Sequence, residues 1–127
     1  MIPTVRLNRV GMPATLWLDE FGSQVYAAFG DFPYLVGSAL EGDRTPADVD
    51  VRLILADAEY ESRGFGDPAQ PHRNAKWVSL VLAYSALGRQ MTGLPIDFQI
   101  QQMTRANERE NGRPRSAIGF VPLRMAP

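Results

Sequence analysis

The sequence predicts an α+β domain in which a small mixed sheet packs against helices. Two stretches carry apolar residues at helical spacing, and three short stretches have strand character. In chain order they read helix, strand, strand, helix, strand. The length of 127 residues suits a single domain. Residues 1–13 are expected to form an N-terminal arm, and residues 104–127 a mainly irregular tail that starts with a short helix.

The first helix is expected over residues 14–30. Apolar residues recur along it at steps of four and five residues, from Leu16 to Phe29. Gly30 is expected to end the helix, and Gly22 weakens the prediction because glycine is a poor helix former.

Two strands follow, separated by a connection rich in glycine, proline and aspartate. Residues 32–38 are aromatic and β-branched, which is typical of a short buried strand. Residues 48–56 are the strongest strand of the sequence, because charged and apolar residues alternate along them. The charged face carries Asp48, Asp50 and Arg52.

The second helix is expected over residues 72–93, after a polar connection that contains a short helical turn. Apolar residues recur at helical spacing from Trp77 to Leu87, and Gly93 ends the pattern. Residues 95–101 then alternate between apolar and polar side chains, which predicts a half-buried strand with Asp97 on its polar face.

Composition narrows the possible chemistry. The chain has no cysteine and a single histidine, His72, which excludes disulfides, thiolate zinc sites and histidine-rich metal sites. The net charge of −1 gives no global attraction to nucleic acid or to anionic membranes. No long apolar run resembles a signal peptide or a membrane span, so a cytoplasmic location is expected.

Three aspartates are the main candidates for a functional site. Asp48 and Asp50 share one strand face, and Asp97 joins them if the later strand pairs with theirs. Two carboxylates about 4 Å apart repel by roughly 4 kcal/mol at an effective dielectric constant near 20, so such a cluster needs a cation. Oxygen ligands favour Mg²⁺ or Mn²⁺, usually completed by water and phosphate. Gly37 and Ser38 follow a strand, where backbone N–H groups and a hydroxyl can hold a phosphate.

This pattern resembles the nucleotidyltransferase fold of the DNA polymerase beta superfamily, in particular its small members, the minimal nucleotidyltransferases. The shared features are a strand that ends in Gly-Ser, a turn-rich connection, Asp-x-Asp on the next strand and a lone Asp on a third. The resemblance is close over residues 34–55 and loose over residues 96–99.

The resemblance implies an activity and a role for each matching residue. Gly37 and Ser38 would contact the nucleoside triphosphate, Asp48 and Asp50 would hold metal ions, and Asp97 would activate the acceptor hydroxyl or bind metal. The implied reaction is the Mg²⁺- or Mn²⁺-dependent transfer of a nucleoside monophosphate from ATP or another nucleoside triphosphate. The acceptor, an RNA 3′ end, a protein or a small molecule, is left open.

Two residues depart from the family pattern. Glu41 stands where many relatives have a basic residue, and Arg52 where an apolar residue is usual. Arg52 could stabilise a triphosphate or instead neutralise the carboxylates as their partner. The second option implies a catalytically inactive binding or regulatory module, for example an antitoxin or an assembly subunit. A domain this small is also expected to form a homo-oligomer or to bind a partner protein.

The basic residues of the tail are interleaved with acidic ones, which predicts a solvated surface rather than a nucleic-acid patch. If the acceptor is RNA, these residues are the first expected contact: Arg105, Arg109, Arg113 and Arg115.

Overall fold

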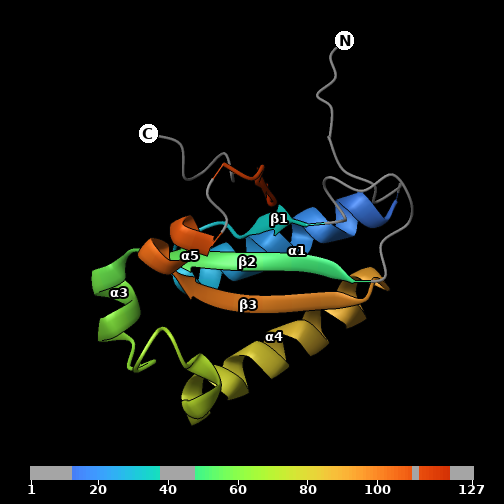
Figure 1. Ribbon diagram of the computed structural model, residues 1–127. Helices are drawn as coiled ribbons and strands as arrows, with labels where there is room; N and C mark the ends of the chain where they lie inside the picture. The colour runs from blue at the N-terminus through green and yellow to red at the C-terminus, as the bar shows by residue number, and fades with distance from the viewer. Residues whose placement is uncertain (1–12, 38–47, 110–111, 121–127) are drawn as a thin grey trace.

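The computed structural model describes residues 13–37, 48–109 and 112–120, and the statements below concern these residues (Figure 1). The elements are α1 (Ala14–Phe29), β1 (Tyr34–Val36), β2 (Val49–Leu55), α3 (Asp57–Ser62), the short 3₁₀ helix η1 (Pro71–Arg73), α4 (Ala75–Thr92), β3 (Ile96–Gln102), α5 (Met103–Arg109) and β4 (Ser116–Ala117). Ser38, Glu41 and most of the expected N-terminal arm lie outside the described residues.

The strands form one mixed sheet in the order β3-β2-β1-β4. β1 pairs antiparallel with both β2 and β4, whereas β2 and β3 are parallel. The α+β class and the mixed sheet are therefore confirmed, together with both long helices and the three expected strands. β4 is not predicted by the sequence pattern, because two residues are too short to show an alternation.

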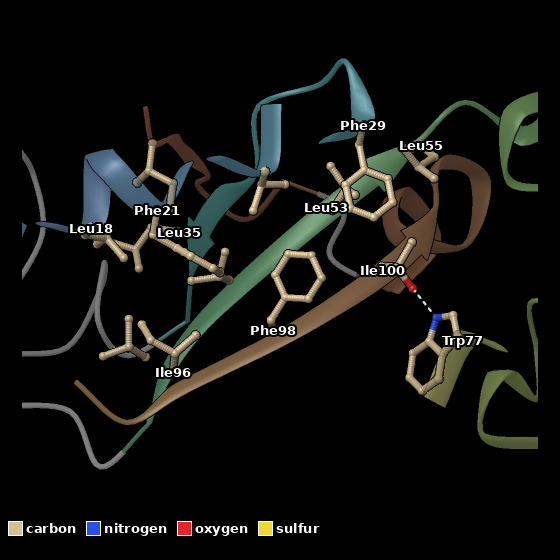
Figure 2. Packing of buried hydrophobic residues seen from close by; sticks show 14 of the residues in the cluster. Leu18, Phe21, Phe29, Leu35, Leu53, Leu55, Trp77, Ile96, Phe98 and Ile100 are labelled. Carbon is tan, nitrogen blue, oxygen red and sulfur yellow. Dashed lines mark hydrogen bonds between the residues drawn. The ribbon is translucent and has the colours of Figure 1, made fainter. Parts of the chain in front are cut away.

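The hydrophobic core lies between the sheet and the pair of helices α1 and α4. Figure 2 shows part of its packing. Phe98 occupies its centre, with its ring edge-on to Phe21 at 6.0 Å and tilted against Tyr84 at 5.4 Å. Alternation along β2 and β3 directs their apolar residues toward these helices. The polar residues of both strands consequently share the opposite face of the sheet.

One apolar residue of α1 does not face the core as its spacing suggested. Leu16 is 48% exposed, whereas Leu18 is fully buried. The core face runs from Leu18 through Phe21 and Val25 to Phe29, at steps of three and four residues. Five residues from Leu16 to Phe21 correspond to well over one helical turn, which places Leu16 on a different side of the helix.

The segment between β2 and α4 contributes buried residues to the core, although its composition is mainly polar. Its short helical turn is present as α3. Tyr60 and Phe65 are both buried, with their rings 5.2 Å apart. The two aromatic side chains anchor this connection to the core.

Side chains of α4 form hydrogen bonds with the backbone of β3, the strand at one edge of the sheet. Trp77 donates its indole N–H to the Ile100 carbonyl at 2.9 Å (Figure 2). Ser85 Oγ accepts the Phe98 N–H at 2.9 Å, and Arg89 Nε donates to the Ile96 carbonyl at 3.1 Å. An uncovered edge strand invites pairing with other chains, and these contacts occupy that edge.

We expect Ser85→Ala to lower the free energy of unfolding by about 1–3 kcal/mol, because the substitution removes the acceptor of a buried N–H group. Urea titration of the wild type and the variant measures this difference. Ser62→Ala is the matched control, since its exposed hydroxyl donates to the Glu59 carbonyl within the same helical turn. Equal stability of the two variants would contradict the role of Ser85.

Candidate functional site

The polar face of the sheet brings together the aspartates of two strands. In the parallel pair of β2 and β3, Asp50 lies opposite Asp97, and Arg52 lies opposite Gln99. The expected pairing of the two strands is therefore present. It places a carboxylate from each strand at adjacent positions on the same face.

Arg52 lies between these two carboxylates. Its Nη2 is 3.6 Å from Asp50 Oδ1 and 3.4 Å from Asp97 Oδ2. Its Nη1 donates to the backbone carbonyl of Asp97 at 2.8 Å and to that of Val51 at 3.2 Å. The guanidinium thus interacts with both strands at once. Of the two roles that the sequence leaves open for Arg52, contact with the carboxylates is the one present in this structure.

The exposure of these groups determines how strongly they interact. The side chain of Arg52 is 14% exposed, that of Asp50 27% and that of Asp97 40%. Charges at partly buried positions are screened less than surface charges, so the positive charge of Arg52 offsets the repulsion between the carboxylates. Both carboxylates still reach solvent, from which a ligand can approach.

Gly37 places a backbone turn directly against Asp50. Its φ of 72° lies in the left-handed region, and a Cβ at this position would be 2.6 Å from Asp50 Oδ2. Only glycine fits such a turn without displacing the carboxylate. One oxygen of Asp50 therefore faces the turn after β1, and the other faces Arg52. Ser38, the second residue of the expected phosphate contact, is outside the described residues.

Asp48 does not join the other two aspartates in a ready cluster. It is exposed, just before β2. In the described part of the chain, no group of three or more acidic or histidine side chains is arranged to hold a metal ion. Mg²⁺ is commonly held by one or two carboxylates plus the phosphates of a substrate. Asp50 and Asp97 fit that donor set, provided that Arg52 moves away from them.

A hollow of about 240 Å³ opens beside Asp50 and Arg52. Gly37 also lines this hollow, as do two arginines of the C-terminal segment, Arg113 and Arg115. The sequence pattern assigns these arginines to a solvated surface. Arg113 and Arg115 lie just before β4, outside the strand, and their approach to the hollow follows from the pairing of β4 with β1 rather than from a local sequence signal.

A side-chain hydrogen bond ties the C-terminal segment to α5. Arg115 donates to Asn107 of α5 at 2.9 Å. The start of α5 is held in turn by Asp57, whose carboxylate accepts the backbone N–H and the hydroxyl of Thr104. These hydrogen bonds lower the pKa of Asp57. The helix that positions Arg115 is therefore linked to the first turn of α3.

The fold and the site together define a small α+β domain with a charged site on the polar face of a mixed sheet. Comparison with family models, with curated proteins and with solved structures found no match to this chain. Among the described residues, no helix has the length and apolar character needed to cross a membrane.

Proposed function

We propose that this protein is a nucleotidyltransferase of the polymerase beta type, which transfers a nucleoside monophosphate from a nucleoside triphosphate to a hydroxyl acceptor. The supporting observation is the register of β2 and β3, which sets Asp50 opposite Asp97 beside the glycine turn of Gly37. This arrangement supports the proposal, because two carboxylates lie next to a glycine turn whose backbone N–H groups would be available to a phosphate.

The proposed chemistry assigns a task to each residue. Asp50 and Asp97 would hold Mg²⁺ or Mn²⁺, which would offset the charge of the phosphates. The exposed Asp48, just before β2, would add a further carboxylate once the metal is bound. Gly37 would present its backbone to the triphosphate with Ser38. Asp97 would accept the proton of the acceptor hydroxyl while the oxygen of that hydroxyl attacks the α-phosphorus. A new P–O bond forms, the bond between the α-phosphorus and the bridging oxygen breaks, and pyrophosphate leaves.

A second candidate is a catalytically inactive module of the same type, which binds a nucleotide or a protein partner. The position of Arg52 between Asp50 and Asp97 favours this candidate, because a guanidinium there takes the place of a metal ion. Metal-dependent turnover with any nucleotide would exclude it.

Transfer of α-labelled nucleotides tests the proposal. Each of the four nucleoside triphosphates is incubated with the protein and Mg²⁺ or Mn²⁺, with RNA, the protein itself and hydroxyl-bearing small molecules as acceptors. We expect label to be transferred by the wild type and lost in the Asp50→Asn/Asp97→Asn variant, which removes the charge of both proposed ligands.

Asp31→Asn is the matched control for this experiment, since Asp31 is an exposed aspartate on the connection between α1 and β1. It should transfer label at the wild-type rate. Transfer that persists in the double variant would overturn the assignment of Asp50 and Asp97. Transfer by neither protein, with nucleotide still bound, would favour the inactive module.

A further inference from the structure

The hollow beside β1 combines features suited to a polyanion. Three of the side chains at its wall are arginines, Arg52, Arg113 and Arg115, and Asp50 is the acidic one. These three arginines outnumber the two carboxylates that contact Arg52, Asp50 and Asp97, although the chain as a whole carries a net charge of −1. A concentration of arginines in one hollow of a slightly acidic protein does not follow from its overall composition.

We propose that Arg52, Arg113 and Arg115 bind the phosphate chain of a nucleoside triphosphate in this hollow. The proposal rests on the proposed function and adds to it two residues of the C-terminal segment. Guanidinium groups match phosphate oxygens in charge and in planar, two-pronged geometry. The volume of about 240 Å³ is below the usual range for a whole drug-sized ligand, which suits part of a ligand such as a phosphate chain.

The C-terminal segment is fixed to the fold from Arg115 onward, where Arg115 donates to Asn107. Immediately after Arg115, Ser116 pairs with Leu35 of β1. Farther along, the Gly119 N–H binds Asp19 Oδ1 at 2.9 Å, and the Phe120 N–H binds Ser23 Oγ at 2.7 Å. A segment fixed at several points loses little conformational freedom when it binds a ligand.

Arg52 connects the hollow to the carboxylates. It lines the hollow and also contacts Asp50 and Asp97. In the proposed complex, the side chain changes rotamer, gives up its carboxylate partners and its hydrogen bond to the Asp97 carbonyl, and binds phosphate oxygens instead. Such an exchange would leave the carboxylates available to a cation at the moment when the phosphate chain arrives.

Calorimetric titration with tripolyphosphate in EDTA tests the proposal without any metal. We expect the wild type to bind, and the Arg113→Gln/Arg115→Gln variant to bind about tenfold more weakly or worse at fixed low salt. The control is Arg73→Gln/Lys76→Gln, which removes two positive charges around the start of α4, outside the hollow. Its affinity for tripolyphosphate should stay within about twofold of the wild type, since charges outside the hollow act on the ligand only through a screened long-range attraction.

Two further variants separate loss of charge from loss of structure. Asn107→Ala removes the partner of Arg115 but keeps its charge, so it should retain most of the binding. Arg115→Lys retains the charge without the planar fork and should bind with an intermediate affinity. Absence of binding to the wild type, or equal losses in the control and the double variant, would overturn the proposal.

Further ligands identify the source of the phosphate. Binding of nucleoside triphosphates at least as tightly as tripolyphosphate, with the same dependence on Arg113 and Arg115, supports a nucleotide in the hollow. Tighter binding of an RNA oligonucleotide with that dependence would assign the hollow to an RNA backbone and overturn the proposal.

The two proposals can fail separately. Arginine-dependent phosphate binding without any nucleotidyl transfer would overturn the proposed function and leave the site intact. Conversely, nucleotidyl transfer with an unchanged KM for nucleotide in the Arg113→Gln/Arg115→Gln variant would overturn the site alone.

Discussion

Arg52→Gln is expected to lower the free energy of unfolding by about 1–3 kcal/mol, less than for a fully buried ion pair because both carboxylates are partly exposed. The substitution leaves Asp50 and Asp97 close together without the guanidinium between them. Their mutual repulsion then acts in the folded state and is relieved when the chain unfolds.

The same substitution is expected to strengthen binding of Mn²⁺ by about tenfold or more, because the cation no longer competes with a positive side chain. Mn²⁺ should therefore stabilise the variant more than the wild type in thermal unfolding, in proportion to its affinity. Titration followed by electron paramagnetic resonance measures the free metal directly.

Arg63→Gln is the matched control for Arg52→Gln, since Arg63, the residue that ends α3, pairs with Glu59 at 2.8 Å and not with Asp50 or Asp97. It should leave metal binding unchanged. Weaker Mn²⁺ binding in Arg52→Gln than in the wild type would show that Arg52 does not compete for the carboxylates.

Gly22→Ala is expected to destabilise the protein by about 2 kcal/mol or more, although alanine favours the helix by up to about 1 kcal/mol. A Cβ on Gly22 would lie within 3.0 Å of backbone atoms of Ile118 and Gly119, which cannot rotate away as a flexible side chain could. The C-terminal segment must then separate from α1 and lose the hydrogen bonds to Asp19 and Ser23.

Gln24→Ala provides the comparison within the same helix, at an exposed position. It should change the free energy of unfolding by less than about 0.5 kcal/mol. Denaturant unfolding of both variants gives the difference, and tripolyphosphate binding gives a second readout, because release of the segment would also displace Arg113 and Arg115. Stabilisation by Gly22→Ala would contradict the close packing of the segment on α1.

Gly22 also shows where local patterns mislead. In the sequence, a glycine inside an apolar helix pattern only weakens the prediction of a helix. In the structure, the absence of a side chain lets the segment around Ile118 approach the backbone of α1. The two segments are almost a hundred residues apart, so no local spacing could indicate their contact.

The sequence by itself determined the two long helices, the three longer strands and the polar faces of β2 and β3, but not β4 or the core face of α1. Alternation in residues 48–56 and 95–101 placed Asp50, Arg52 and Asp97 on polar strand faces, because strand periodicity is a local property of the backbone. Helical spacing of apolar residues, also a local property, predicted α4. Gly30 and Gly93 marked the ends of the two long helices.

Tertiary structure decided how those faces meet. The parallel register that sets Asp50 opposite Asp97 depends on how two distant strands pair. The position of Arg52 between the carboxylates depends on that pairing. Arg113 and Arg115 lie at the hollow because β4, which follows them, pairs with β1. Register and packing are set by the burial of side chains from the whole chain, which no short window of sequence contains.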